Sequence, residues 1–221
     1  GPPNRYTDSK VDTDPYKTPS QNSFGLHETI ETDSKKPFLL AGDIRNDKSQ
    51  ELILVDGSTI SVLTAAGQRL DQKTYKEIQF HAGIVEDIDR DGKEDIILGA
   101  FEDENIRFVY LSGSLQILSD TQFEELVRGN TTPCFIYDNK LFFTAVSSYS
   151  MSPKIVGAIR FGEQKPDWLY RLGPVPLDIT LDKTSETIAV SHRAVSQEWR
   201  EVTEDFDVPK EQQGLLLLDA Q

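Results

Sequence analysis

Short hydrophobic runs separated by polar turns recur along the chain from Pro37 onward. Several are nearly continuous runs of aliphatic or aromatic residues, which are typical of strands buried on both faces. Others alternate apolar and polar residues, as in 168–172, which is typical of a strand with one solvated face. The pattern therefore predicts an all-β protein. The runs that we expect to be buried are residues 38–41, 52–55, 96–98, 141–143, 155–159, 188–190 and 215–218.

A turn with the same spacing of acidic residues divides these runs into units. The segment that begins at Asp43 aligns without gaps on the segment that begins at Asp87, and related segments begin near Thr132 and at Asp178. Repeats of about 40–50 residues that are rich in short strands are typical of propeller blades. We therefore predict a β-propeller, or a propeller fragment, of about four blade-like antiparallel units in residues 36–221. The expected units are about 37–74, 77–120, 132–172 and 176–221.

The two ends of the chain depart from this pattern. Residues 1–35 are rich in Pro, Ser, Thr and charged residues and are expected to form a flexible tail, in which only 24–30 has the character of a strand. The last unit carries an acidic insertion at 193–213 and stops after its third strand. Either residues 24–30 supply the missing strand and close the ring, or the chain is one part of a larger propeller; we favour the second.

The turn of the second unit carries the most specific chemical motif in the chain. Four acids, Asp87, Asp89, Asp91 and Asp95, occupy relative positions 1, 3, 5 and 9, and Gly92 occupies position 6. Carboxylates this close repel one another unless a cation lies between them, and oxygen ligands at alternate positions suit a hard ion such as Ca²⁺. The glycine permits the sharp bend that such crowding requires. The alternative is an acidic surface turn without metal.

This turn and the strand after it resemble the calcium loop of the FG-GAP, or VCBS-type, repeat of integrin-like β-propellers, which has the form D-x-D-x-D-G-x-x-D. The resemblance implies that the four aspartates bind Ca²⁺ through their side chains and that Lys93 binds it through its backbone carbonyl. It also implies an extracytoplasmic setting, whether periplasmic, secreted or cell-surface, where calcium is abundant. An EF-hand is disfavoured, because position 12 is Leu98 in a hydrophobic run instead of a glutamate.

The corresponding turns of the first and fourth units keep only part of the motif. In the first unit, Arg45 replaces the second aspartate. We expect its guanidinium to take the place of the cation and to pair with Asp43, Asp47 or Glu51. In the fourth unit, Thr180 stands at position 3 and the glycine is missing, so we expect a weak site at best. The metal of the second unit would then be structural and would stabilise the fold through linked binding.

Composition narrows the classes of partner. The chain has 37 acidic and 23 basic residues, a formal net charge of −14, which argues against binding to nucleic acid or to anionic lipid. No apolar stretch approaches the ~20 residues of a membrane helix, so membrane insertion is not expected. The single cysteine, Cys134, excludes an intrachain disulfide and is expected in the core. The histidines His27, His81 and His192 lack partners at metal-ligand spacing and are expected to be strand or turn residues.

No nucleophile, phosphate-binding or zinc-protease motif occurs in the sequence. We therefore expect a non-enzymatic calcium-binding propeller scaffold that recognises a protein or glycan partner. Trp199 and Arg200, in the 193–213 insertion, are the candidate partner surface because both residue types are enriched in binding hot spots. The equal alternative is that Trp199 serves only to pack the insertion onto its blade. Two alternatives remain open. One is a propeller lyase, hydrolase or quinone-dependent dehydrogenase with a central pocket, and the other is an assembly subunit that is completed by a partner strand or by additional blades.

Overall fold

The computed structural model describes residues 32, 34, 36–102, 105–127, 129–147, 154–193 and 214–219. The chain divides into two units, residues 1–31 and 32–221, and every strand reported below belongs to the second. Three expectations therefore fall outside the described residues. They concern the tail with its strand at 24–30, almost all of the 193–213 insertion, and the partner surface at Trp199 and Arg200.

Fifteen strands and no helix occur in the described residues, which confirms the all-β prediction. The strands form four antiparallel sheets, and in each sheet they follow one another in chain order. Sheet A consists of β1 (Phe38–Gly42), β2 (Glu51–Asp56), β3 (Thr59–Leu63) and β4 (Arg69–Thr74). Sheet B consists of β5 (Gln79–Glu86), β6 (Asp95–Glu102), β7 (Asn105–Leu111) and β8 (Ile117–Val127). Sheet C consists of β9 (Gly129–Tyr137), β10 (Lys140–Ser147), β11 (Lys154–Arg160) and β12 (Trp168–Leu172). Sheet D consists, in the described part of the chain, of β13 (Val175–Asp182), β14 (Thr187–Arg193) and β15 (Gly214–Asp219).

The continuous hydrophobic runs form the middle strands of the sheets. In β7, residues 106–111 are all buried, and in β11 residues 154–159 are all buried. By contrast, every residue of the outer strand β4 is exposed. Branched and aromatic side chains favour such pleated, well-packed positions. The described part of the chain contains no helix that could cross a membrane.

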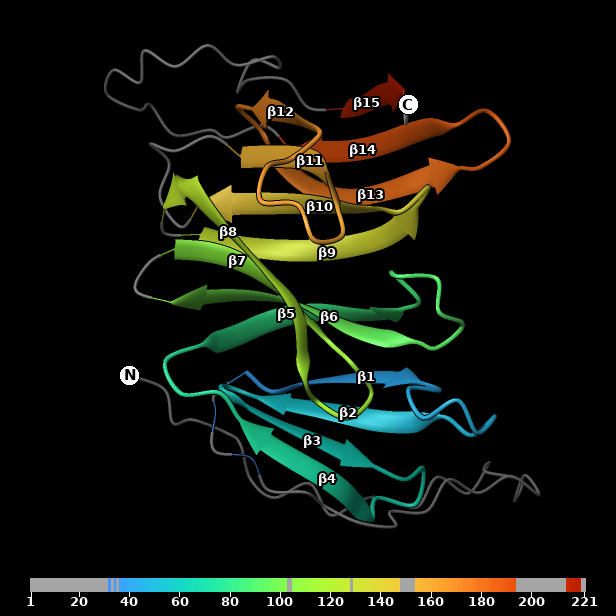
Figure 1. The fold of residues 1–221 in the computed structure, drawn as a ribbon. Coiled ribbons are helices and arrows are strands. Elements are labelled where there is room, and N and C mark those ends of the chain that lie inside the picture. Colours follow the sequence, from blue (N-terminus) through green and yellow to red (C-terminus); the bar gives the residue numbers. More distant parts are fainter. Residues whose placement is uncertain are drawn as a thin grey trace, which may run out of the picture. The chain divides into compact units, whose positions relative to one another are not determined.

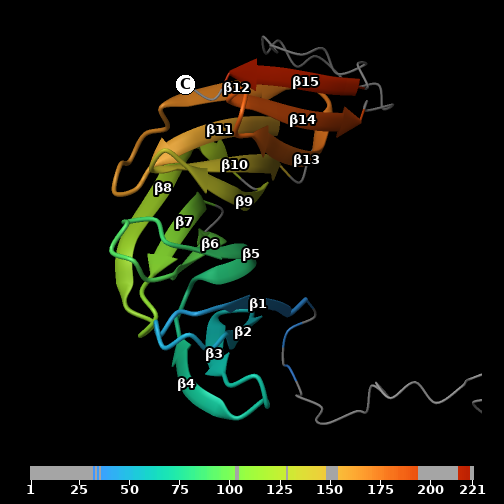
Figure 2. The same ribbon diagram turned by 90° about the vertical axis from the view of Figure 1, so that its right-hand side faces the viewer.

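Neighbouring sheets pack against one another in chain order, from sheet A through sheet D (Figures 1 and 2). Three separate hydrophobic clusters lie between the sheets. Between sheets B and C, the rings of Phe108 and Phe143 meet edge to face with their centroids 5.0 Å apart. Between sheets C and D, Phe142 and Val190 are fully buried. Each unit therefore completes its core only with its neighbours, as expected for a repeat protein.

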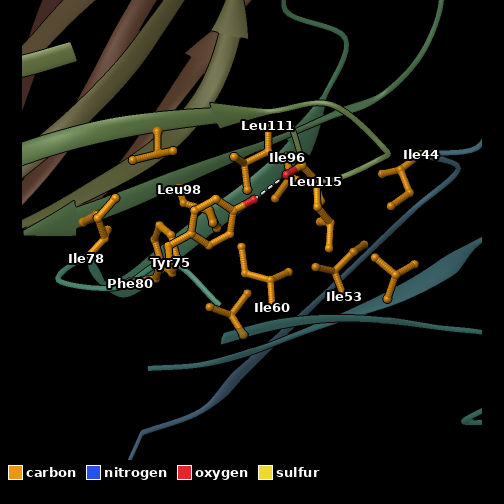
Figure 3. Packing of buried hydrophobic residues seen from close by; sticks show 14 residues of the cluster. Ile44, Ile53, Ile60, Tyr75, Ile78, Phe80, Ile96, Leu98, Leu111 and Leu115 are labelled. Carbon is orange, nitrogen blue, oxygen red and sulfur yellow. Dashed lines mark hydrogen bonds between the residues drawn. The ribbon is translucent and has the colours of Figure 1, made fainter. Parts of the chain in front are cut away.

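The cluster between sheets A and B contains one buried polar contact. Tyr75 follows β4, and its hydroxyl donates to the carbonyl of Leu115, in the β7–β8 turn, at 2.6 Å (Figure 3). Burial is the main cause that raises the pKa of Tyr75 to about 12. Lys73 Nζ donates to the same carbonyl at 2.8 Å. These contacts tie the end of sheet A to the far turn of sheet B, and the hydrophobic pattern gave no sign of them.

The run 215–218 is not the buried strand that its composition predicts. Leu216 and Leu218 pack on sheet C, but Leu215 and Leu217 are 62% and 60% exposed. Alternate residues of a strand point to opposite faces of its sheet. One face of β15 therefore contacts the core, while the other has no neighbouring sheet among the described residues.

Candidate metal site

The β5–β6 connection, residues 87–94, contains the predicted calcium loop. The flanking strands stay in register up to the pair formed by Glu86 and Asp95. Arg90 and Gly92 have positive φ values of 62° and 86°, and a Cβ on Gly92 would meet no atom within 4 Å. The backbone conformation, and not a lack of space, is therefore what favours glycine at this position.

Local hydrogen bonds to aspartate side chains shape this loop. The amide of Gly92 donates to Asp87 Oδ2 at 3.0 Å. The amide of Asp91 donates to Asp89 Oδ1, also at 3.0 Å. Such bonds are typical of turns that begin with aspartate. Ile88 is 1% exposed and packs between sheets B and C, so the beginning of the loop is anchored in the core.

Three carboxylates of the loop come together. Asp87, Asp89 and Asp95 each place one oxygen within 4.8 Å of the others. Asp95 is only 5% exposed, Asp87 is half-buried and Asp89 is exposed. Oδ2 of Asp95 and Oδ1 of Asp87 are buried without a hydrogen-bond partner among the described residues. Such oxygens are unfavourable because nothing replaces the water that they have lost.

The electrostatics of this group favour the binding of a cation. The pKa of Asp95 is raised to about 7, first by burial and then by the charges of Asp89 and Asp91. A nearby positive charge would reverse this shift, because it favours the ionised carboxylate. Carboxylate and carbonyl oxygens are also the ligands that Ca²⁺ prefers. The residues present therefore fit a hard divalent cation.

Asp91, the remaining predicted side-chain ligand, does not join this group. Its Oδ2 lies 2.9 Å from Nζ of Lys93, and its Oδ1 accepts from the Lys93 amide at 2.8 Å. The hydrogen bonds from Lys93 lower the pKa of Asp91. The structure thus brings together three of the four predicted carboxylates and pairs the fourth with a lysine. The role of the Lys93 carbonyl as a ligand stays a prediction.

The corresponding loop of sheet A, residues 43–50, has the same backbone form. Asn46 and Lys48 have positive φ values of 56° and 70°, at the positions of Arg90 and Gly92. Two turns with different side chains therefore share one conformation, although only the loop of sheet B gathers three carboxylates among the described residues.

The expectation that Arg45 replaces the cation in this loop is wrong. Arg45 is exposed, and no ion pair joins it to Asp43, Asp47 or Glu51 within the described ranges. Both oxygens of Asp43 accept instead from backbone amides of the loop at 2.9 Å, so the guanidinium gains little by leaving water. Glu51, in the place of Asp95, is 3% exposed, and its Oε2 lacks a partner in the described structure.

The fourth unit has no comparable loop, which corrects the expectation of a weak site there. Asp178 lies inside β13, opposite Ser191, and Asp182 is the last residue of the strand. A strand rises about 3.3 Å per residue, which places four residues about 13 Å apart. The matching spacing in the sequence therefore corresponds to carboxylates that are too far apart to share an ion.

A hollow of about 590 Å³ lies beside the 87–94 loop. Arg90 lies 3.8 Å from Asp138 across it, and the Tyr137 hydroxyl donates to Glu186 Oε1 at 2.9 Å. Sequence reasoning missed this site because its members come from turns of three different sheets and form no motif. Its lining residues are Glu86, Asp87, Arg90, Ile136, Tyr137, Asp138 and Glu186.

The two described histidines and the cysteine all lie within strands. His81 lies in β5, and its Nε2 is 2.8 Å from both the amide nitrogen and the carbonyl oxygen of Thr131 in sheet C. Burial lowers the pKa of His81. His192 is buried in β14. Cys134 is partly buried, and burial raises the pKa of its thiol to about 12, so it is poorly reactive.

No protein-family model and no curated protein sequence match this chain. Among solved structures, the Dos1 propeller matches it with a TM-score of 0.51 and 10% sequence identity, over 70% of this chain and 41% of that one. The fold is that of a β-propeller. This propeller chain thus spans less than half the length of the Dos1 propeller chain.

Two further structures have lower TM-scores. The quinohemoprotein alcohol dehydrogenase ADHIIG from Pseudomonas putida HK5 has a TM-score of 0.44 and 10% identity, over 64% of this chain and 27% of that one. A protein of unknown function from Bacteroides caccae has a TM-score of 0.33 and 9% identity, over 82% of this chain and 77% of that one. At 10% identity, the similarity to the Dos1 propeller indicates the fold and not the activity.

Proposed function

We propose that this chain is a non-enzymatic β-propeller scaffold of the FG-GAP or VCBS type, in which one Ca²⁺ ion held by Asp87, Asp89 and Asp95 stabilises the β5–β6 hairpin. The observation that supports this best is Asp95, a nearly buried carboxylate with an unpartnered oxygen beside the unpartnered oxygen of Asp87. An acidic turn without metal can satisfy its carboxylate with backbone amides, as Asp43 does in sheet A.

The residues of the chain have distinct roles at this site. Asp95 is the first residue of β6, so its position is fixed by the strand. Ile88 anchors the loop in the core, and Gly92 allows the backbone to turn the carboxylates inward. When bound, the ion offsets the repulsion among these carboxylates. Binding to the folded state alone would stabilise the protein by about 2.7 kcal/mol at a free concentration 100 times the Kd.

Thermal unfolding of the full chain in chelator and in millimolar Ca²⁺ tests the metal site. Calcium should raise the Tm of the natural chain by about 5–10 °C at saturating concentrations. Asp95→Asn should lose most of this increase, whereas Asp47→Asn, at an exposed acid of the sheet A loop, should keep it. If the natural chain melts at the same temperature in both buffers, the calcium proposal is wrong.

The partner in this proposal is a protein or a glycan. It contacts the end of the propeller where the β5–β6, β9–β10 and β13–β14 turns lie. Turns of three successive sheets line one hollow there, and the adjoining Arg90 and Asp138 are largely exposed. Trp199 and Arg200 stay proposed contacts. An extracytoplasmic location is part of the proposal, because free calcium is high enough there to fill a modest site.

A glycan array and a panel of extracellular proteins, probed with the labelled full chain, would test recognition. Specific binding should weaken in Trp199→Ala and in Arg90→Ala, and it should persist in Arg69→Ala, which alters an exposed strand of sheet A. Binding that none of these substitutions changes would place the partner on another surface and would contradict this part of the proposal.

A further inference from the structure

The face of sheet D that points away from sheet C is apolar and exposed. The corresponding faces of sheets A, B and C are covered by the next sheet. In sheets A, B and C, the third strand points two apolar side chains at the next sheet, and all six are 0% exposed. These residues are Ile60 and Val62 in β3, Phe108 and Tyr110 in β7, and Val156 and Ala158 in β11. Leu215 and Leu217 hold this place in β15, yet they are 62% and 60% exposed. Leu177, at the irregularity in β13, is 60% exposed.

Sheet A has the complementary face. Phe38, Leu40, Ile53 and Val55 point toward sheet B, so the alternate residues of β1 and β2 point away from it. Those residues include leucines, of which Leu39 is 56% exposed and Leu52 and Leu54 are half-buried. In sheets B, C and D this side of the sheet packs on the preceding sheet. Sheets A and D are the two ends of the series (Figure 1).

Among the described residues, the third strand of sheet D also lacks an outer neighbour. In sheets A, B and C an outer strand pairs with the third strand and leads directly into the next sheet: β4 into β5, β8 into β9 and β12 into β13. In the sequence, residues 24–30 stand before β1 as these outer strands stand before β5, β9 and β13. In this segment Phe24, Leu26 and Ile30 share one face of a period-2 pattern, with Glu28 at the remaining position of that face. By its place in the chain, this segment corresponds to the outer strand of a sheet that precedes sheet A.

We propose that a second copy of this chain covers these faces, with sheet A of each copy packed on sheet D of the other and residues 24–30 of each copy paired with its partner's β15. The junction would repeat the arrangement already present between sheets A and B, B and C, and C and D. The two faces differ, so the contact is head-to-tail, and in the proposed assembly a twofold axis relates two such contacts and closes the ring at two copies. The resulting eight sheets lie within the ~4–8 blades of known propellers.

Sedimentation equilibrium of the full chain tests the association. The natural chain of 24.9 kDa should show twice this mass. Leu217→Glu introduces a charge into both junctions and should weaken the dimer by roughly tenfold or more. The matched control is Leu118→Glu, which alters a leucine of β8 that is 43% exposed and should leave the dimer intact. A single-chain mass at all concentrations would overturn the proposal, as would equal loss of the dimer in both variants.

Cross-linking distinguishes this arrangement from other dimers. In a Cys134→Ala background, Leu39→Cys and Leu217→Cys are made as separate proteins and treated with a short bis-maleimide. Neither protein alone should give a cross-linked dimer, whereas an equimolar mixture should. Cross-linking of either protein alone would indicate packing of like faces and would refute the proposal.

A proline in the tail tests the added strand. Leu26→Pro removes a backbone donor and should weaken the dimer, whereas Ser9→Pro, outside the segment with strand character, should not. If Leu26→Pro dimerises as strongly as the natural chain, the strand addition is wrong.

Discussion

Replacing Asp95 by asparagine should have opposite consequences with and without calcium. Asn has nearly the same shape but no charge, so it removes the buried ionisable group and leaves the packing in place. In the metal-free protein the pKa of Asp95 is about 7, whereas an unfolded aspartate has a pKa of about 3.9. Between these two values the folded state holds a proton that the unfolded state has released. Raising the pH therefore lowers the free energy of unfolding.

The difference between the two pKa values sets the size of the effect. A gap of about three pKa units corresponds to about 4 kcal/mol, at about 1.4 kcal/mol for each pH unit between pH 4 and pH 7. Small movements of the Asp89 side chain would reduce this penalty, so about 4 kcal/mol is its upper limit. In chelator, Asp95→Asn should match the natural chain near pH 4 and become more stable than it by pH 7.5. With calcium present, the natural chain should gain stability and the variant should not.

Urea unfolding at several pH values, in chelator and in calcium, measures both effects. Asp47→Asn is the matched control, and its stability should follow that of the natural chain in chelator and in calcium alike. Parallel pH profiles for Asp95→Asn and the natural chain in chelator would show that Asp95 is not an unfavourable buried charge. The electrostatic argument for the metal would then fail.

Three further substitutions and one control substitution test the packing of the sheets, each read out as the free energy of unfolding in urea. Phe143→Ala should lower it by about 3–5 kcal/mol, because the ring is fully buried and packs on two other phenylalanines, with centroids 5.0 and 5.5 Å away; a loss under 1 kcal/mol would contradict the packing between sheets B and C. Gly99→Ala should lower it by about 1–3 kcal/mol, since the new Cβ would lie 2.2 Å from the carbonyl oxygen of Thr131. Gly214→Ala, with no atom within 4 Å, should change it by less than about 0.5 kcal/mol. Tyr75→Phe should lower it by about 1 kcal/mol through loss of the hydrogen bond to the β7–β8 turn, and an unchanged value would show that this bond contributes nothing.

Most of the fold could be predicted from the sequence because hydrophobic runs and turns are local signals. The strands of the first three units follow from these runs, and three strands of sheet D lie within the described residues. The exposure of Leu215 and Leu217 could not be predicted in this way. Composition shows that a strand can be buried, but whether both of its faces are covered depends on its neighbours.

The acidic motif predicted the candidate site only in part. Asp87, Asp89 and Asp95 come together, whereas Asp91 pairs with Lys93 two residues away, a competition that ligand spacing does not reveal. In the fourth unit the same spacing failed because β13 continues through the acids as a regular strand. Residue spacing predicts a cluster only where the backbone turns, and hydrogen bonds within the turn decide which side chains face one another.

The shared backbone of the turns at 43–50 and 87–94 makes sheet A a place to engineer a second ion receptor. Lys48, at φ 70°, already occupies a conformation that glycine adopts without strain, and the buried Glu51 already offers an oxygen that lacks a partner in the described structure. Arg45→Asp together with Lys48→Gly would therefore give this loop the aspartate at position 3 and the glycine at position 6 that the 87–95 motif has. Titration calorimetry that resolved a second calcium in this variant would show that the backbone conformation of the loop is encoded separately from the side chains that bind the ion.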